Sequence, residues 1–505
     1  MISLQQHLHD LSDVRLQGIR RGIEKESLRA QPNGTLTLTP HPTALGSALT
    51  HPHITTDFCE SQVEIVTGVH ASVDACLDEL TQTHQFVYRE IGDEVLWAAS
   101  MPCGLPPDET IPLGRYGTSN VGRAKSVYRM GLGHRYGRRM QTISGIHYNW
   151  SMPGISNDEY FALIRNFRRH SFLLLYLFGA SPAVCSTFVA GREHRLQPLS
   201  ADTLHMPHGT SLRMGRLGYK SDAQATLAVS YNCLESYGAS LQDALTRPYP
   251  PYEALGIRNP GGEYNQLATS LLQIENEFYG VIRPKRVIRP GERPLHALRE
   301  RGIEYVEVRL MDLNPFEPVG IGAGTIAFLD AFLLHCLLAD SPPDTPQEIA
   351  ALGRNQNRTA ERGREPALRL ERGNAELTLA QWGMQILGDC GPIAARLDAA
   401  RGGSTHADAL ASAAAALGDP ERTPSANVLR AMREAHDSSY TGFVKARSAL
   451  IKQELMQRSY TDEMHARFTQ LALESRKQRR RIEGADTLPF EEFREWYLSA
   501  QRLVV

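Results

Sequence analysis

Alternation of polar and apolar positions over residues 302–315 predicts a β-strand with one charged face. Side chains of a strand point alternately to its two sides, so Tyr305, Glu307 and Arg309 share one side and apolar residues occupy the other. If the apolar side packs on a core, the carboxylate and the guanidinium face a cleft, where an unmatched charge is costly. Metal ions and phosphate groups are natural partners for such a face.

Three further segments, residues 18–29, 55–68 and 141–153, carry polar residues at alternate positions and are also predicted to be strands. Any one of them alone is better explained by solvated carboxylates or by a structural histidine, because Glu is nearly always exposed. Their occurrence together favours a shared site. The side chains concerned are Glu24, Glu26, Asp57, Glu64 and His147.

These strands predict an α+β fold with a curved, mainly antiparallel sheet whose concave side is acidic and whose convex side is covered by helices. Buried core helices are expected within residues 172–184 and 326–338, where the most apolar runs occur. Neither run is long enough to cross a membrane. We also expect a helix at 225–237 and a short strand at 273–277, where polar and apolar residues alternate again.

The chain has 505 residues, which is too long for one simple core. From about residue 340 its composition shifts to Ala, Arg, Glu and Gln with helical periodicity. We therefore expect residues 1–340 to form a catalytic α+β domain and residues 341–505 a mainly helical C-terminal region packed on it.

Charge and cysteine content narrow the class of function. Lys and Arg number 54 against 56 Asp and Glu, so the sequence has no electrostatic signature of nucleic-acid or membrane binding, and small-molecule chemistry is favoured. The seven cysteines are scattered and lack C-x-x-C spacing, and the polar first 15 residues lack the apolar core of a signal peptide. A reduced cytoplasmic location without a zinc cluster fits these features best.

Clustered carboxylates repel one another unless divalent cations bind between them. Oxygen-rich ligation with one imidazole indicates Mg²⁺ or Mn²⁺ before Zn²⁺. Arg309 and the cations within residues 283–286 suit a polyphosphate, and together these are the recurring parts of phosphoryl transfer. The residues alone thus favour an ATP-dependent enzyme, with a Mg²⁺-dependent phosphohydrolase and a non-enzymatic binding protein as alternatives.

Several long motifs, in a fixed order, give the sequence a family resemblance. They include RGIEKESLR at 21–29, HPTALGSALT at 41–50, YGTSN at 116–120, QTISGIHYN at 141–149 and IRPKR at 282–286. The chain resembles the proteobacterial glutamate-cysteine ligases, also called γ-glutamylcysteine synthetases, densely from about residue 18 to 340. Beyond that the similarity is one of helical composition.

The resemblance implies that the γ-carboxylate of L-glutamate is joined to the amine of L-cysteine at the expense of ATP, through a γ-glutamyl phosphate. This reaction is the first step of glutathione biosynthesis. The resemblance also implies a sheet that forms a funnel, similar to the folds of glutamine synthetase and the guanidino kinases. Glutamate ligation to another amine stays open, because acceptor choice depends on few contacts.

Residue roles follow from the same resemblance. It implies metal ligation by Glu24, Glu26, Asp57, Glu64, His147 and Glu307, catalysis by Arg309 with Glu307, amino-acid binding by Tyr128, Arg129, Arg213, Tyr219 and Tyr279, and nucleotide contacts from Lys285 and Arg286. Mg²⁺, or Mn²⁺ in its place, and ATP are the expected cofactor and co-substrate. The expected partners are these small molecules, without nucleic acid or membrane, and a monomer is compatible with the sequence.

Overall fold

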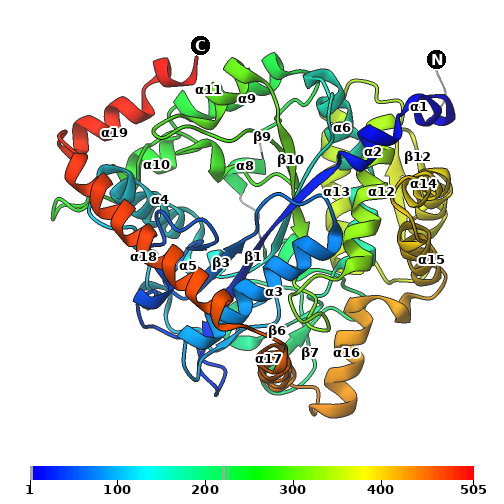
Figure 1. The fold of residues 1–505 in the computed structure, drawn as a ribbon, viewed down its shortest axis with the longest axis horizontal. Helices are drawn as coiled ribbons and strands as arrows, with labels where there is room; N and C mark the ends of the chain where they lie inside the picture. Colours follow the sequence, from blue (N-terminus) through cyan, green and yellow to red (C-terminus); the bar gives the residue numbers. More distant parts are fainter. Residues whose placement is uncertain (1–3, 219–221, 226, 505) are drawn as a thin grey trace.

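A β-sheet with helices packed on it forms the centre of the protein. The computed structural model describes residues 4–218, 222–225 and 227–504. Among these residues, seven strands pair in the order β2-β3-β1-β5-β10-β9, with β4 beside β1 (Figure 1). Every pairing is antiparallel. The strands are β1 (Arg20–Ala30), β2 (Ile54–Thr56), β3 (Gln62–Val66), β4 (Val95–Leu96), β5 (Ile146–Ser151), β9 (Ile282–Lys285) and β10 (Tyr305–Met311).

The predicted alternation fixes which face of the sheet is buried. Ile23 of β1, Tyr148 and Trp150 of β5, and Val306 and Val308 of β10 are fully buried on the core side. Residues between them point to the opposite face, because successive side chains of a strand alternate. The expected α+β class with an antiparallel sheet therefore agrees with the structure.

Helices α3 (Val73–Glu90), α6 (Asn157–Phe178) and α12 (Ala323–Leu338) cover this core side of the sheet. A buried ion pair connects β1 to α12, with Arg21 Nη2 2.7 Å from Asp330 Oδ2. The Tyr148 hydroxyl of β5 donates to the other oxygen of Asp330 at 2.8 Å. The Asp330 carboxylate thus connects two strands to one helix. Each of its oxygens has a partner, which a buried charge needs.

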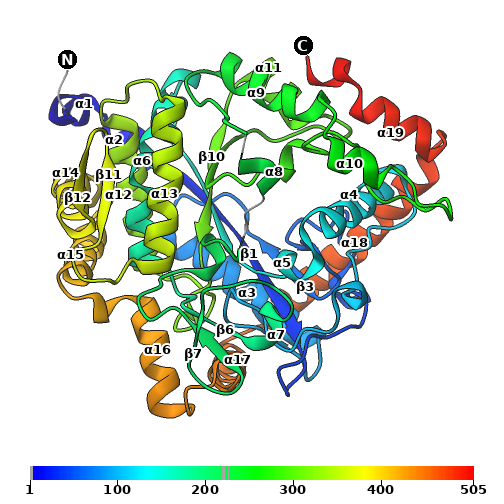
Figure 2. The same ribbon diagram turned by 180° about the vertical axis from the view of Figure 1, so that it is seen from behind.

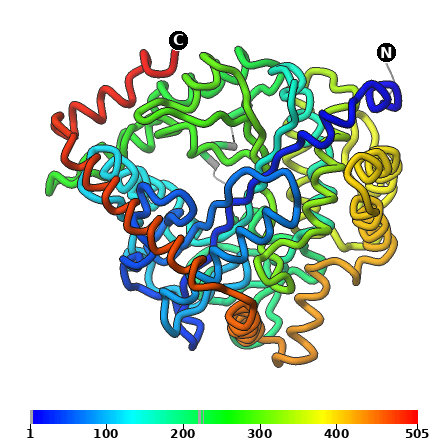
Figure 3. The backbone as a smooth tube through the Cα atoms, in the orientation of Figure 1, coloured from blue at the N-terminus to red at the C-terminus, as the bar shows by residue number. Residues whose placement is uncertain are grey.

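The C-terminal part of the described chain is mainly helical. Figure 2 shows α13 (Pro346–Arg362) beside α6 and α12, and α13 packs directly on α6. In Figure 3 the blue N-terminal helices and the red C-terminal helices lie on opposite sides of the molecule. The other helices of this region are α14 (Leu379–Arg401), α15 (Thr405–Gly418), α16 (Pro424–Ala435), α17 (Tyr440–Gln457), α18 (Asp462–Ala485) and α19 (Phe490–Leu498).

Further α-helices and strands complete the described chain. No helix within it combines the length and apolar character that crossing a membrane requires. The remaining elements are α1 (Leu4–Asp10), α2 (Asp13–Gln17), α4 (Asn120–Tyr136), α5 (Arg138–Gln141), β6 (Ala183–Cys185), α7 (Ser186–Val189), β7 (Gln197–Pro198), β8 (Thr203–His205), α8 (Asp222–Ala225), α9 (Leu234–Thr246), α10 (Pro250–Leu255), α11 (Pro294–Arg301), β11 (Arg369–Arg372) and β12 (Ala375–Thr378).

Two of the expected elements are wrong. The segment 273–277 is not a strand, because Glu275–Glu277 forms a 3₁₀ turn whose buried carboxylates pair with Arg293 at 2.7 Å and Arg135 at 2.9 Å. In the segment 225–237, which is expected to be a helix, residues 227–233 are not helical, and α9 begins at Leu234 and continues to Thr246. At 273–277 the tertiary ion pairs outweigh the local pattern.

A third expectation is correct only in its first part. The apolar run 172–184 is helical to Phe178, where α6 ends at Gly179, and then enters strand β6. A Cβ added at Gly179 would lie 2.5 Å from the Leu175 carbonyl oxygen and 2.7 Å from that of Thr210, so the chain needs glycine to turn there.

Candidate active site

The face of the sheet opposite the core helices carries the charged residues that the alternation predicted. Strand register places Glu24 of β1 opposite His147 of β5, and Glu26 opposite Glu64 of β3. Glu307 of β10 lies opposite Asn149 of β5. Glu24 and Glu307, 283 positions apart in the chain, therefore lie on one face of the sheet, on the two strands that flank β5. They line a cavity of about 1130 Å³.

His147 lies at the centre of a carboxylate cluster. Its Nδ1 is 3.2 Å from Glu24 Oε2 and 3.7 Å from Glu307 Oε1, and its Nε2 is 3.6 Å from Glu26 Oε1. One ligand atom each from Glu24, Glu64 and His147 lies within 4.8 Å of the other two. The structure thus brings together five of the six residues expected to hold metal. Asp57, the sixth, lines the same cavity.

Burial and mutual repulsion shift the carboxylate pKa values of this cluster. Burial, followed by the charges of Asp57, Glu24 and Glu26, raises the pKa of Glu64 well above its usual range. Burial and then Asp57 raise the pKa of Glu26 to about 8. Closely spaced buried carboxylates cannot all ionise without added positive charge. The cluster therefore favours either protons or cations.

Glu307 differs from these carboxylates because cations surround it. Burial acts to raise its pKa, but the neighbouring positive charges, Lys285 and Arg309 foremost, together outweigh burial and hold that pKa well below the usual range. Its Oε1 lies 3.1 Å from Arg309 Nη1 and 3.5 Å from Lys285 Nζ. Within the described chain, its buried Oε2 has no hydrogen-bond partner. An ionised carboxylate with a vacant buried oxygen fits a metal ligand better than a purely structural role.

The donor set suits a hard divalent cation. Five carboxylates and one imidazole supply oxygen-rich ligation, which Mg²⁺ and Mn²⁺ prefer, and no cysteine occurs among the cavity-lining residues that the structure describes. Burial, followed by the neighbouring Arg309, lowers the pKa of His147. Its imidazole is therefore held neutral, which is the form that ligates metals.

Most of the residues expected to bind amino acids also line this cavity, namely Tyr128, Arg129, Arg213 and Tyr279. Arg213 is buried, and its Nη2 donates to the Arg309 carbonyl oxygen at 2.9 Å. A Cβ at Gly145 would lie 2.2 Å from that Nη2, so glycine there makes room for the guanidinium. Tyr219, also expected to bind substrate, lies outside the described residues.

Of the two residues expected to contact the nucleotide, only Lys285 lines the cavity. The Arg286 side chain follows the end of β9, where its Nε donates to the Gly302 carbonyl and its Nη1 lies 3.7 Å from Glu304. Arg283 lines the cavity instead, opposite Glu307 in the sheet register. Strand periodicity accounts for this placement, because residues two apart share a face and adjacent residues do not.

Sequence reasoning also missed helix α13. Residues of this helix line the cavity although they belong to the region expected to be only a helical annex. Their spacing by three or four positions is typical of one face of a helix, and the sequence shows this spacing. It does not show which part of the protein that face contacts. The α13 residues concerned are Pro346, Ile349, Ala350, Gly353, Arg354, Gln356 and Asn357.

Comparison with known proteins gives this site a family. Residues 4–359 match the family described as Glutamate-cysteine ligase. The chain belongs to the glutamate-cysteine ligase family. It is 44% identical over 519 aligned positions to a glutamate–cysteine ligase of Alcanivorax borkumensis, covering 98% of this chain and 99% of the relative. A glutamate–cysteine ligase of Pseudomonas putida is 48% identical over 472 positions, covering 90% of each chain.

Solved structures of glutamate-cysteine ligase relatives agree with the fold. The crystal structure of the Francisella tularensis glutamate–cysteine ligase in complex with AMP superposes with a TM-score of 0.91 at 34% identity, covering 96% of this chain and 98% of that one. A bifunctional glutathione synthetase of Pasteurella multocida superposes with a TM-score of 0.70 at 26% identity, covering 93% of this chain and 57% of that one. The family expected from the sequence motifs is confirmed.

Proposed function

We propose that the chain joins the γ-carboxylate of L-glutamate to the amine of L-cysteine at the expense of ATP, giving γ-glutamylcysteine, ADP and phosphate. Membership of the glutamate-cysteine ligase family supports this reaction. The AMP held by the Francisella relative supports ATP as co-substrate. The observation that carries the proposal is the carboxylate cluster beside Arg309 and Lys285, in a cavity with room for a nucleotide and amino acids.

The residues that would hold Mg²⁺, or Mn²⁺ in its place, are Glu24, Glu26, Asp57, Glu64, His147 and Glu307. A bound divalent cation neutralises phosphate oxygens as a phosphoryl group is transferred. The sheet holds these metal ligands rigidly. Because they lie on paired strands, their separations are already fixed, and binding does not have to order them at a cost in entropy.

Arg309 has the role of stabilising the phosphoryl group during transfer. Its Nη1 is held by Glu307 at 3.1 Å and is 3.5 Å from His147 Nδ1, so the guanidinium is fixed in direction at the edge of the carboxylate cluster. The planar group carries five N–H donors, and those not used on Glu307 are available to phosphate oxygens. Lys285 supplies a second positive charge on the neighbouring strand.

The reaction needs no protein nucleophile. A γ-carboxylate oxygen of glutamate attacks the γ-phosphorus of ATP, and the bond from that phosphorus to ADP breaks, which leaves γ-glutamyl phosphate. The cysteine amine then attacks the acyl carbon, phosphate departs and the amine loses a proton. The protein contributes position and charge, which can supply much of the barrier reduction. Tyr128, Arg129, Arg213 and Tyr279 would orient the amino acids.

The wider architecture belongs to the same proposal. We infer that the sheet forms a funnel like that of glutamine synthetase, that residues 1–340 are the catalytic part and that residues 341–505 form a helical region packed on it. Helix α13 of the second region completes the cavity wall. A cytoplasmic location is supported by cysteines that are free thiols throughout the described chain, as is usual in a reducing compartment.

Release of ADP in the presence of Mg²⁺, with glutamate fixed and a panel of amines varied, tests the function. We expect ADP to form only when glutamate and cysteine are both present. Equal ADP release without amino acids would instead identify a phosphohydrolase. A greater kcat/KM for another amine would keep the ligase chemistry but overturn cysteine as acceptor.

A further inference from the structure

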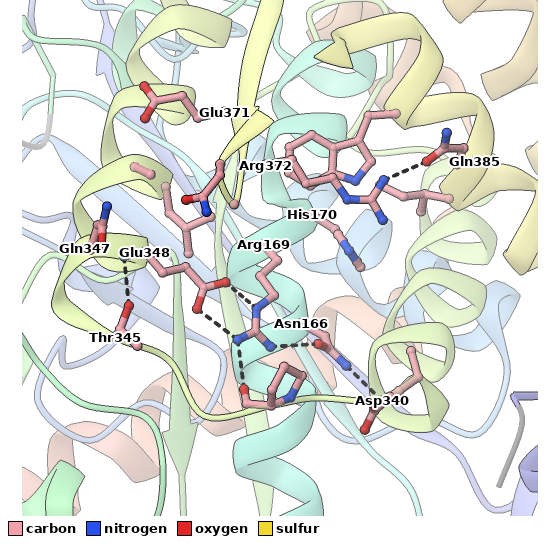
Figure 4. Close-up of a pocket in the computed structure, with 18 of the residues that line it drawn as sticks. Asn166, Arg169, His170, Asp340, Thr345, Gln347, Glu348, Glu371, Arg372 and Gln385 are labelled. Carbon is pink, nitrogen blue, oxygen red and sulfur yellow. Dashed lines mark hydrogen bonds and ion pairs between the residues drawn. The ribbon is translucent and has the colours of Figure 1, made fainter. Parts of the chain in front are cut away.

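A second cavity of about 640 Å³ is lined in part by residues of α13 (Figure 4). Residues of α6, α12, α13 and α14 line it, among them His170, His335, Trp382 and Asp389. Arg354 of α13 lines both cavities, so a single helix separates them. The proposed ligase reaction uses no residue that lines only this second cavity.

Two histidines from different helices meet at this cavity. The rings of His170 on α6 and His335 on α12 have centroids 5.4 Å apart, and their planes are inclined by 32°. Figure 4 shows His170 projecting from α6 among the cavity residues. Cys336, the next residue of α12, is fully buried beside them. One nitrogen or sulfur atom from each of the three residues lies within 4.8 Å of those of the other two.

Two ring nitrogens of this cluster have no hydrogen-bond partner within the described chain. His335 is only 2% exposed, and its Nδ1 has no hydrogen-bond partner there. The Nδ1 of His170 also lacks one. A buried polar atom without a partner costs about 1–3 kcal/mol, so one such nitrogen on each of two neighbouring rings requires an explanation. Ordinary packing of a histidine in a core does not provide it, because such histidines are usually hydrogen-bonded.

A carboxylate completes the surroundings. Asp389 Oδ2 of α14 lies 3.8 Å from His335 Nε2, the ring nitrogen opposite the unpartnered one. A carboxylate on the far nitrogen is the usual means of orienting a metal-binding histidine. Burial lowers the pKa of His335, and burial followed by His335 lowers that of His170, so both imidazoles are neutral and able to ligate.

We propose that His170, His335 and Cys336 bind a divalent cation of the zinc class at the edge of the second cavity. Two imidazoles and a thiolate are ligands that zinc prefers, whereas the carboxylate cluster of the substrate cavity suits harder ions. Bonds of about 2.0–2.3 Å in a tetrahedral site place ligand atoms roughly 3.4–3.7 Å apart. Atoms now within 4.8 Å reach that spacing by movements of about 1 Å.

The three protein ligands leave a fourth position for water, while Asp389 stays on the far nitrogen of His335. Binding joins α6 to α12 through bonds that the metal-free protein lacks. The Cys336 thiol must lose its proton to bind, so binding releases one proton and strengthens as the pH rises. The site stands apart from the proposed ligase chemistry, and the test below does not depend on that chemistry.

Cobalt titration of the full chain tests the site. Co²⁺ is added under non-chelating reducing conditions with Mg²⁺ in excess, so that the carboxylate cluster stays occupied by Mg²⁺. We expect one equivalent of Co²⁺ to give a thiolate-to-cobalt charge-transfer absorption that Zn²⁺ abolishes. The described residues that line the substrate cavity include no cysteine, so cobalt bound to them gives no such band. Its absence from the wild-type protein would overturn the proposal.

Variants assign the ligands. We expect the band to disappear in Cys336→Ser and to persist in the matched control Cys233→Ser, whose thiol is partly exposed elsewhere. We expect His170→Gln, a change at a partly exposed residue that leaves the core intact, to weaken Co²⁺ binding by more than about tenfold. A band that persists in Cys336→Ser, or unchanged affinity in folded His170→Gln, would overturn the assignment.

Discussion

Replacement of Arg309 by Lys tests the chemistry of the substrate cavity most directly. Lysine keeps the positive charge next to Glu307, which lies 3.1 Å from Arg309 Nη1, so the buried carboxylate is not left unpaired. The ammonium group is compact and lacks the planar fork of donors that a guanidinium presents to two oxygens at once. The change therefore removes directional hydrogen bonds while largely preserving local electrostatics.

The magnitude follows from the hydrogen bond that lysine cannot make. With one side of the guanidinium occupied by Glu307, Arg309→Lys forfeits about one charge-assisted hydrogen bond to the transferring phosphoryl group, worth roughly 1.5–3 kcal/mol. Each 1.36 kcal/mol added to the barrier slows the reaction about tenfold. We therefore expect kcat to fall by about 10- to 150-fold, with the KM for glutamate changed much less, because this hydrogen bond strengthens in the transition state.

Steady-state ADP release with saturating glutamate, cysteine and Mg²⁺ measures this effect. Arg286→Lys is a matched control, since Arg286 follows the neighbouring strand but bonds to Gly302 and Glu304 outside the cavity, and its kcat should stay within about twofold. An Arg309→Lys enzyme with unchanged kcat and raised KM would refute the reasoning. Arg309 would then bind substrate in the ground state without assisting phosphoryl transfer.

Two predictions concern stability. Asp330→Ala should lower the free energy of unfolding by about 3–5 kcal/mol in urea denaturation, because it leaves the buried Arg21 without its counterion. Arg247→Ala, which breaks an exposed ion pair, is the control and should lower it by less than about 1 kcal/mol. Equal losses in the two variants would contradict this prediction. Without Mg²⁺, Glu26 keeps its proton up to a pH of about 8 in the folded state, whereas in the unfolded chain it loses that proton near pH 4.5. The free energy of unfolding should therefore fall as the pH rises between these two values. Mg²⁺ should flatten this pH dependence. A free energy of unfolding that does not change with pH even without Mg²⁺ would argue against the raised pKa of Glu26.

Strand periodicity predicted more of the site than any single motif did. It placed Glu24, Glu307 and Arg309 on open faces correctly, because alternation is a property of the backbone and holds wherever one face of the sheet is buried. The same rule, applied past the end of β9, distinguishes Arg283 and Lys285, which line the cavity, from Arg286, which does not.

Local patterns failed where distant partners decide the structure. Alternation at 273–277 predicted a strand, but Glu275 and Glu277 are drawn into a 3₁₀ turn by Arg293 and Arg135, which lie 18 and 142 positions away. A buried carboxylate follows its counterion because leaving it unpaired costs more than any strand preference gains. Nothing within a short window of sequence carries that information.

The sequence by itself determined the α+β class, the faces of the central strands and, through its motifs, the family. These depend on side-chain alternation and on residue types, both of which are local. The tertiary structure alone decided which faces meet: it set His147 among three carboxylates, brought α13 to the wall of the substrate cavity and placed His170 beside His335. Such meetings depend on how helices and strands pack across the whole chain, because each buries its apolar face against partners far away in sequence.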